Sequence, residues 1–493
     1  MIITKSDLWL LSPELSLTML ALVVILLDLF VKRRIVVALT ALVGLAIPAG
    51  FTFALAANPP ANPHAFFNML TVDQYAIFFK LLFLLIGAVM ILVSYDYVNK
   101  YVRSAGEFYA LLLLSVTGMM LMASTTELIT IFISLELTSI PLYIMAGLLR
   151  GDDRSAEAAV KYVLLGAMSS AILLYGFALL YGLTGTTDLR GIAQATLISG
   201  FAHDNILLLL ADIFVLAGFG FKISAVPFHT WAPDIYEGAP TPATAFFSVG
   251  SKAAGFAALI RVFIGANLGP SNGHTIVMLL GVIAILTMTL GNVVAIVQSN
   301  IKRMMAYSSI GQAGYILVGF AASAGTHNPA GTGSVLFFLF VYVLTNLGAF
   351  AGIVAMSHAL GTDNIRNFNG LRSRNAWLAV GTAICLLSLA GVPPMAGFIA
   401  KVILFAAAWQ QGLTWLVVIG VLNSLISMGY YGYIVYAMFV KNPLKEGHIS
   451  STPALNTALA ISSVGIIAVT FLTQFMLNQA QIGAQSLAAF LGH

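Results

Sequence analysis

Four charged side chains lie inside long apolar runs of this sequence. They are Glu136 in IFISLELTSIP, Lys222 in GFGFKISAVPF, Lys252 in SVGSKAAGF, and Lys401, which follows AGVPPMAGF. A lysine at the centre of a membrane helix costs about 2.5–3.5 kcal/mol on insertion scales, and such residues usually line an ion or proton path. Burial lowers the pKa of a lysine and a nearby carboxylate raises it, so these residue types can exchange protons. The four residues are predicted to form a proton relay.

The energies involved fit transport against a membrane potential. Moving one proton against 150 mV costs about 3.5 kcal/mol, which corresponds to about 2.5 pKa units. Making and breaking an ion pair between Glu136 and Lys222 is one way to supply that change. The alternative is that each charge forms a structural ion pair or extends to the membrane surface. This alternative stays open for Lys80 and Lys161, nearer the ends of their apolar runs, whereas four central charges exceed what packing requires.

Two of the apolar runs are too long for one straight crossing and contain helix breakers. One holds Val226-Pro227 and the other holds Pro393 and Pro394. A broken helix frees backbone groups, which is tolerated at membrane depth only where protein or water satisfies them. Broken helices at corresponding places in two halves are typical of inverted-repeat transporters. The prolines are therefore predicted to interrupt both helices, the alternative being simple kinks.

Further polar groups lie close to these features. His229 follows the first break and can shuttle protons near neutral pH, although a hydrogen-bonded core histidine is an equally good interpretation. Ser308, Ser309, Gln312 and Tyr315 place polar groups on another apolar run that has no carboxylate. They can hold ordered water or make helix-packing contacts.

Composition predicts the elements that must position these residues. The chain is 60% hydrophobic and 8% charged, with a mean hydropathy of +0.97, whereas soluble domains carry about 25% charged residues. Apolar runs of 18 or more residues recur from end to end, and each predicts a membrane helix. We expect an all-α polytopic membrane protein with fourteen spans and no separate soluble domain. The spans are 8–31, 35–57, 74–98, 106–123, 127–149, 155–183, 205–232, 241–265, 274–298, 302–324, 333–360, 375–410, 413–440 and 454–479.

The two breaks predict an internal symmetry. They lie in the seventh and twelfth spans, and an odd offset of five spans inverts the topology. Helices 4–8 and 9–13 are therefore predicted to be two inverted five-helix repeats within a single membrane domain. The predicted boundaries are 1–104 for helices 1–3, 105–266 for the first repeat, 273–441 for the second, and 453–493 for helix 14 and the tail.

Basic residues are unevenly divided between the two sets of predicted loops. One set holds fourteen of the 22 lysines and arginines, and the opposite set holds only Lys5, Arg190 and Arg261. Because loops on the cytoplasmic side carry the excess of basic residues, both termini are predicted on the non-cytoplasmic side. The fourteen are Lys32, Arg33, Arg34, Lys100, Arg103, Arg150, Arg154, Lys302, Arg303, Arg366, Arg372, Arg374, Lys441 and Lys445.

The sequence argues against a redox centre or a metal site in this chain. Haem requires axial ligands inside the spans, and of eight histidines only His229, with His358 near a span end, is placed there. The single cysteine, Cys385, cannot form an internal disulfide or a thiolate metal site and is interpreted as a core residue. The scattered basic residues do not predict nucleic-acid binding.

Five segments carry a resemblance to a known family. The sequence resembles the subunit N branch of the antiporter-like membrane subunits of respiratory complex I, the proton-pumping NADH:quinone oxidoreductase. The segments are SLELTSIPLYIMAG (134–147), EAAVKYVLLGAMSSAILLYG (157–176), GFGFKISAVPFHTWAPDIYEGAPTPATAFFSVGSKAAGF (218–256), QSNIKRMMAYSSIGQAGYILVG (298–319) and SLAGVPPMAGFIAKVILF (388–405).

The resemblance implies roles for these residues and for the chain. The family's proton path falls on the four central charges, and Lys161 matches a helix-six lysine that modulates the Glu136–Lys222 pair. Lysine at 401 argues against the related subunit M, which carries glutamate there. Protons would cross this subunit, while other subunits would use NADH, FMN, iron–sulfur clusters and quinone. The expected partners are other membrane subunits, including related antiporter-like ones, and lipid.

The resemblance also implies a location in a bacterial plasma (inner) membrane, an organellar inner membrane being the alternative. The competing function is a subunit of a multi-subunit cation/proton antiporter, which shares the ancestral module and would carry the same buried charges. The amino-acid sequence of helices seven and eight favours the complex I subunit over the antiporter subunit. A purely scaffolding role would not need the buried charges.

Overall fold

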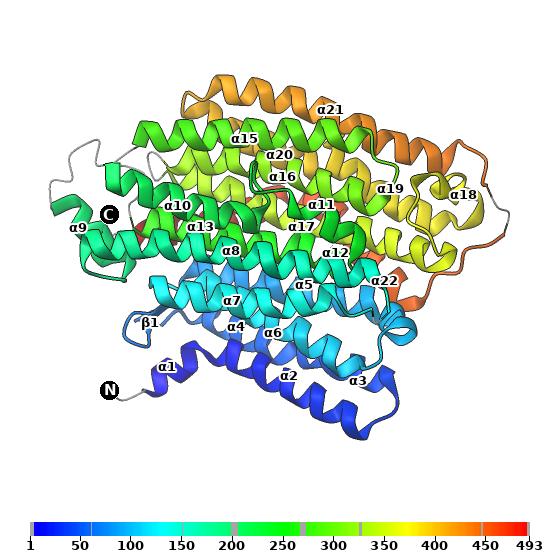
Figure 1. Ribbon diagram of the computed structural model, residues 1–493, viewed down its shortest axis with the longest axis horizontal. Helices are drawn as coiled ribbons and strands as arrows, with labels where there is room; N and C mark the ends of the chain where they lie inside the picture. Colours follow the sequence, from blue (N-terminus) through cyan, green and yellow to red (C-terminus); the bar gives the residue numbers. More distant parts are fainter. Residues whose placement is uncertain are drawn as a thin grey trace.

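The computed structural model describes residues 4–60, 62–149, 151–198, 206–266, 273–324, 328–444 and 447–490. Within these ranges the chain is a bundle of long helices that run in roughly the same direction or its reverse (Figure 1). Twelve helices among the described residues are long and apolar enough to cross a membrane, and two shorter apolar helices, Ala376–Ala390 and Ala396–Gln410, accompany them. The expected all-α polytopic fold is confirmed. Of the predicted loop residues, Arg150 and Lys445 lie outside the described residues.

The first helices of the chain, up to Gly44, lie along one edge of the bundle (Figure 1, dark blue). Its first predicted span is divided at Leu11, because Ser12-Pro13 begins a new helix with proline in the first turn. Asp73 caps the next long helix by accepting from Ala76 N at 2.8 Å. The elements are α1 (Lys5–Leu10), α2 (Ser12–Phe30), α3 (Arg34–Gly44), α4 (Ala46–Ala57), the hairpin β1 (His64–Ala65) and β2 (Leu70–Thr71), and α5 (Gln74–Tyr101).

The next part contains the first interrupted span. The seventh predicted span ends as a regular helix at Ile223, before Pro227, and the chain resumes helical structure only at Trp231. The eighth contains a π-helical turn, which the sequence did not predict. The elements are α6 (Ala105–Ser124), α7 (Leu128–Ala146), α8 (Asp153–Thr184), α9 (Leu189–Ile198), α10 (Ile206–Ile223), α11 (Trp231–Gly238), α12 (Thr241–Phe246), the π-turn η1 (Phe247–Ser251) and α13 (Lys252–Gly265).

The last part contains the second interruption. Helical structure stops at Ala390 and begins again at Ala396, with Pro393 and Pro394 between. The predicted last span, 454–479, is wrong at its end, because one helix finishes at Phe471 and another begins at Thr473. The elements are α15 (Gly273–Ile296), α16 (Ile301–Ala324), α17 (Pro329–Leu360), the 3-10 turn η2 (Ile365–Phe368), α18 (Leu371–Arg374), α19 (Ala376–Ala390), α20 (Ala396–Gln410), α21 (Thr414–Phe439), α22 (Pro453–Phe471) and α23 (Thr473–Ala489).

Burial separates inner helices from outer ones. The most apolar stretch of 241–265 is 100% buried and that of α17 is 94% buried, whereas the values for α8 and α21 are 39% and 33%. All described side chains of α16 except a few near its start are also buried. Since a helix that is apolar and buried all round occupies a core, α13, α16 and α17 form the interior. The charges on α13 and the polar groups of α16 therefore lie inside the protein.

The basic loops gather at one end of the bundle. Arg34, the first residue of α3, donates to the carbonyl oxygen of Val102 at 3.0 Å, which joins the start of α3 to the loop after α5. Lys302 forms an ion pair with Asp363 at 3.3 Å, which joins the loops after α15 and α17. These contacts agree with the predicted grouping of the loops on one side, here called the basic side.

The beginning and the end of the described chain meet at the opposite side. The Asp7 carboxylate accepts from the Phe66 N–H at 3.0 Å, and the His64 ring lies 6.4 Å from the Phe490 ring. Both chain ends accordingly lie on the same side of Figure 1. The placement of Arg261 in a loop on this side was wrong, because it lies within α13 and is fully buried.

Candidate functional site

Glu136 and Lys222 lie on neighbouring helices and are linked through serine hydroxyls. Ser170 of α8 donates to Glu136 Oε1 at 2.5 Å, and Lys222 Nζ donates to Ser139 Oγ at 2.6 Å. Ser139 is three residues from Glu136 on α7, so the two side chains share one helix face. Among the described residues Glu136 and Lys222 form no ion pair within 4.0 Å. The two charged groups are therefore not in direct contact in this structure.

A small cavity lies beside Lys222, between α7, α8 and α10. Its volume is about 10 Å³, and its lining includes Ser139, Ser170 and Lys222. That is close to the smallest space able to hold one water molecule.

Lys252 is the first residue after the π-turn and is buried. Its Nζ donates to the carbonyl oxygen of Ser309 and, at 2.5 Å, to the Ser309 hydroxyl. Tyr342 of α17 lies 3.0 Å from the same hydroxyl and donates to Ser248 O at 3.1 Å. Because π-turns widen a helix locally and are frequent at functional sites, the irregularity next to Lys252 fits a functional position.

The Lys401 side chain binds at the interruption between α19 and α20. Its Nζ donates to the carbonyl oxygen of Ala390, the last residue of α19, at 3.0 Å and to Ser424 Oγ at 2.9 Å. It also lies 4.7 Å from the centre of the Tyr315 ring. The C-terminal carbonyls of a helix carry partial negative charge, so the end of α19 stabilises the ammonium group. Gly391, with φ +82°, completes the turn, and a Cβ there would lie 3.1 Å from Lys401 Nζ.

The helices that carry these charges pack against one another in series, from α10 through α13 and α16 to α20. The stem of Lys222 packs against α13, since a Cβ added at Gly255 would lie 3.1 Å from Lys222 Cγ. Helix α16 then connects Lys252 to Lys401 through Ser309 and Tyr315. These two contact residues are six apart, about 9 Å along the helix. Gln312 lies midway and donates to Leu389 O at 3.2 Å.

The two breaks differ in how their chain is held. In the first, Val226 N donates to Thr287 Oγ1 at 3.0 Å, and Trp231 Nε1 donates to Phe221 O at 2.9 Å. In the second, Gly397 N donates to Ser388 Oγ at 3.1 Å. The peptide bonds Val226-Pro227 and Pro393-Pro394 are both cis.

His229 lies within the first break but apart from the four charges. Its side chain is partly buried, and no hydrogen bond joins it to any of the four in the described part of the chain. Its role as a shuttle therefore stays a prediction.

Lys161 belongs to a separate charge network on the basic side. Its side chain is 42% exposed and pairs with Glu157 at 2.6 Å and Asp234 at 3.2 Å. Asp234 also binds Arg303 at 2.9 Å. Partial burial raises the pKa of the Asp234 carboxyl, but hydrogen bonds from Arg303 and Lys161 lower it more, so the pKa lies below the ordinary value of 3.8. An action of Lys161 on the Glu136–Lys222 pair stays a prediction.

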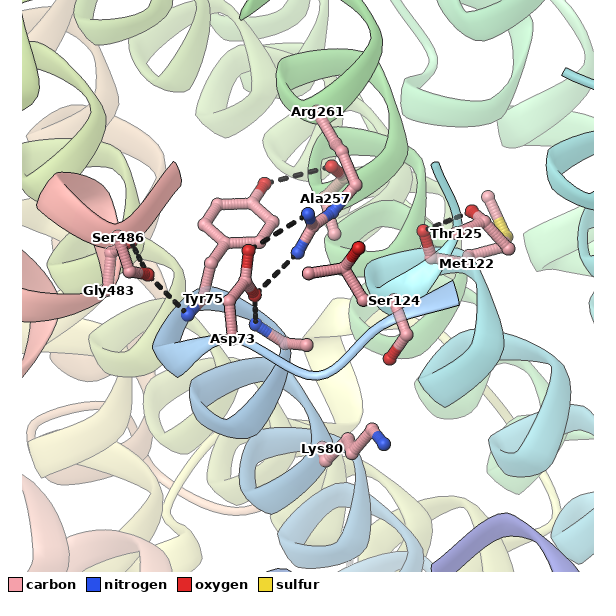
Figure 2. Close-up of polar contacts among 12 residues, drawn as sticks. Asp73, Tyr75, Lys80, Met122, Ser124, Thr125, Ala257, Arg261, Gly483 and Ser486 are labelled. Carbon is pink, nitrogen blue, oxygen red and sulfur yellow. Dashed lines mark hydrogen bonds and ion pairs between the residues drawn. The ribbon is translucent and has the colours of Figure 1, made fainter. Parts of the chain in front are cut away.

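Two buried ion pairs lie outside the predicted series. Lys80 Nζ is 2.8 Å from Glu14 Oε1, and both side chains are at most 3% exposed. Arg261 binds the Asp73 carboxylate with two hydrogen bonds of 2.8 and 3.0 Å, and Tyr75 lies beneath its guanidinium group (Figure 2). Neither Glu14 nor Asp73 stands in a long apolar run on both sides, which explains why the sequence pattern did not single them out. Both pairs stabilise packing between helices.

The serine partners were also missed. Ser139, Ser170 and Ser424 bind the central charges, but single serines are common in membrane helices and carry little signal. The helical spacing of Ser139 from Glu136 was the one available indication. Among the described residues, no group of three His, Cys, Asp or Glu side chains is arranged to hold a metal ion.

Comparison with known proteins supplies an independent finding. A family model described as NADH:quinone oxidoreductase/Mrp antiporter, transmembrane, matches residues 125–427. The NADH-quinone oxidoreductase subunit N of Moorella thermoacetica is 46% identical over 415 residues, which cover 83% of this chain and 85% of that protein.

Solved structures extend the likeness to the whole fold. A chain of respiratory complex I from Thermus thermophilus with bound aureothin is 31% identical, with a TM-score of 0.79 over 94% of this chain and 98% of the other. A chain of the Mrp complex from a Dietzia species has a TM-score of 0.85 over 99% and 100% of the two chains. At 20% identity, that second likeness concerns the fold alone.

Proposed function

Because this chain belongs to the NADH:quinone oxidoreductase/Mrp antiporter membrane family, we propose that it is the proton-translocating subunit N of a NADH:quinone oxidoreductase. The observation that carries the proposal is the placement of Glu136, Lys222, Lys252 and Lys401 on helices that pack in series, with a polar partner at each charge. Three lysines and one carboxylate can change their charge by gaining or losing a proton, and a static scaffold does not need such groups inside the membrane.

In this proposal, proton movement depends on the distance between Glu136 and Lys222. When Glu136 and Lys222 approach, their attraction favours the ammonium form of Lys222; when they separate, burial favours the neutral amine. A change of about 2.5 pKa units suffices to move a proton against 150 mV. Release from Lys222 passes charge toward Lys252, and the polar face of α16 leads on to Lys401.

Electron transfer belongs to other subunits in this proposal. The parent complex uses NADH, FMN, iron–sulfur clusters and quinone, whereas this chain contributes the membrane step. Its partners are the other membrane subunits of the complex, including related antiporter-like subunits, and the lipid bilayer. Relatives named subunit N at 46% and 42% identity favour this assignment over a cation/proton antiporter, for which the Mrp likeness supports only the fold.

The proposal includes a membrane topology. The protein lies in a bacterial plasma membrane, with the basic side facing the cytoplasm and both termini on the other side. Residues 105–266 and 273–441 form two inverted repeats, each with one interrupted helix. The breaks after Ile223 and Ala390 support this arrangement.

The proposal is tested by purifying the complex through a tag on this chain. NADH:quinone oxidoreductase activity should co-purify, and inverted membrane vesicles should take up protons on addition of NADH in sodium-free buffer. Replacement of Lys401 by methionine should remove most of that uptake while the complex still assembles on a native gel. Sodium-dependent exchange without any NADH activity in the purified material would instead favour the antiporter function.

A further inference from the structure

A large apolar cavity lies between the N-terminal helices and two helices of the last part of the chain. It has a volume of about 690 Å³ and is lined by residues of α4, α5, α17 and α23. On α4 the lining residues Ala46, Ala49, Phe53 and Ala56 recur every three or four positions, so they form one face of the helix. The alanines on that face leave space that larger side chains would fill, and this space is part of the cavity.

The cavity has a buried floor and an exposed mouth. Leu82 of α5 and Phe337 of α17 are buried and form part of the floor. Phe53 of α4 and Phe475 of α23 are exposed and stand at the mouth. Because α4, α5 and α17 belong to membrane spans, the medium that meets the mouth is lipid.

The cavity is slightly longer than one leaflet of the membrane is thick. Along α4 it extends from Leu45 to Ala56, about 16 Å, and along α5 from Gln74 to Ala88, about 21 Å. Half of a bilayer core is about 15 Å. Gln74 begins α5 on the side opposite the basic loops, so the cavity runs from that surface to the middle of the membrane. An acyl chain of a phospholipid takes the same course through its leaflet.

Two glutamines make one end of the cavity polar. Gln74 and Gln479 are the polar residues in the described lining, and none of the described lining residues is charged. Gln479 lies one helical turn before Gly483, where an added Cβ would be 3.5 Å from the Gln74 main-chain oxygen, so both amides are at the same end. An amide N–H can donate to the ester carbonyl of a lipid, whereas a charged headgroup finds no charged partner in this lining.

The width of the cavity favours an acyl chain over a helix of a partner subunit. Its volume divided by its length along α4 corresponds to a mean cross-section of about 43 Å². A helix of 10–12 Å diameter has a cross-section of about 80–110 Å². The cavity is therefore too narrow for a helix but wide enough for an alkyl chain.

We propose that this cavity binds one acyl chain of a membrane phospholipid, and that Gln74 and Gln479 hold the ester group of that chain. The bound chain supplies the packing contacts that the lining of an empty cavity lacks, so it joins the N-terminal helices to α17. Residues of four helices surround it, which separates it from the freely exchanging lipid around the bundle. The site is independent of the proton relay. It selects its ligand by the length of the chain rather than by the headgroup.

A photo-reactive lipid tests the site in the intact complex. The probe is a phosphatidylethanolamine with a diazirine near the end of one full-length acyl chain, reconstituted with the purified complex, and labelled peptides are mapped by mass spectrometry. A bound chain labels α17 at Phe337 and Phe340, on a helix whose apolar stretch is 94% buried and out of reach of the surrounding lipid. Label at Leu164 and Met168, which are exposed on α8, measures that surrounding lipid. A labelled α8 with an unlabelled α17 would overturn the proposal.

Two alanines of α4 supply a matched pair of variants. Ala49→Phe places a ring inside the cavity, where it competes with the chain for space, and should lower the label on α17 about fivefold or more. Ala57→Phe makes the same change at an exposed position outside the lining, and should leave the label within about twofold of wild type. Equal labelling of α17 in both variants, measured relative to α8, would refute a site in this cavity. The wild-type map decides the question where a variant fails to assemble.

Changes to the probe separate recognition of the chain from recognition of the headgroup. Probes with phosphatidylglycerol and phosphatidylethanolamine headgroups should label α17 equally, because the described lining residues carry no charge. A probe with chains about half as long, too short to reach the middle of the membrane, should label α17 several-fold less. Labelling that follows the headgroup and ignores the chain length would overturn the proposal.

A second cross-link identifies the occupant from the side of the protein. A photo-cross-linking phenylalanine analogue at position 49 faces the cavity and should join to a phospholipid in the intact complex. A cross-link from this position to another subunit would show that a partner's helix occupies the cavity, and would overturn the proposal.

Discussion

Replacement of Lys222 by arginine separates a residue that must release a proton from one that only balances charge. Arginine keeps the positive charge, but its ordinary pKa lies about 3.4 units above that of lysine. At 1.36 kcal/mol per unit, deprotonation of arginine costs about 4.6 kcal/mol more, a factor of roughly 10³. Lys222→Arg should therefore assemble and yet pump at about 1% of the wild-type rate or less.

The inner part of the side chain, which packs against α13, is unchanged by the substitution. Lys222 contacts Gly255 through its Cβ and Cγ atoms, which arginine and methionine retain. Lys222→Met removes the positive charge as well, so comparing it with Lys222→Arg separates loss of the charge from loss of proton release. Lys302→Arg is the matched control, because Lys302 is a buried lysine in a basic-side ion pair with Asp363, where the charge suffices.

The assay is proton uptake and NADH:quinone turnover in inverted vesicles, with the amount of complex checked on a native gel. If pumping and electron transfer are tightly coupled, turnover falls together with uptake in Lys222→Arg. Near-wild-type uptake by this variant would refute the reasoning that Lys222 releases its proton in each cycle.

Three further outcomes follow from contacts outside that pair. Gly391→Ala, at φ +82° and against Lys401, should lower the free energy of unfolding by about 1–3 kcal/mol, seen as a lower thermal transition of the purified complex; an unchanged transition would contradict the close approach. Lys80→Met should lower the free energy of unfolding by about 3–5 kcal/mol, because it leaves Glu14 unpaired, and replacing both residues by apolar ones should restore most of that stability. A double variant as unstable as the single one argues against an ion pair. Asp234→Asn should lower the free energy of unfolding by less than about 1 kcal/mol at pH 7. Because the pKa of Asp234 is lowered in the folded protein, its stabilisation is present above about pH 3.9 and is lost as the pH falls through the folded-state pKa. Thermal scans at pH 7 and pH 3 should therefore show a smaller difference between variant and wild type at the lower pH.

The sequence predicted the helices and the central charges because both depend on strong local signals. A lysine such as Lys252 in an uninterrupted apolar run is recognisable without a structure, and the prolines at 227 and 393 mark interruptions by removing a backbone donor. The partners of these charges depend on tertiary packing instead. Nothing local to Ser424 indicates that it binds Lys401, and the π-turn before Lys252 has no sequence signature in a single chain.

Buried pairs between distant segments were equally inaccessible to sequence reasoning. Arg261 lies near a span end and was assigned to a loop, yet it is fully buried against Asp73, 188 residues away. The outcome depends on how α5 and α13 pack, which periodicity does not determine. The division of the last span at Leu472 lacks a proline or glycine signal as well.

Two of the central lysines donate hydrogen bonds to main-chain oxygens, which has a consequence for mutagenesis. Lys401 binds the main-chain oxygen of Ala390, and Lys252 binds that of Ser309 as well as its hydroxyl. No single codon change can delete a main-chain oxygen, so a scan that replaces residues one at a time would pass over half of what holds these lysines. Loss-of-function alleles in this region should therefore include residues that shape the backbone, such as Gly391, whose substitution disturbs the surroundings of the Lys401 ammonium as well as the stability of the fold.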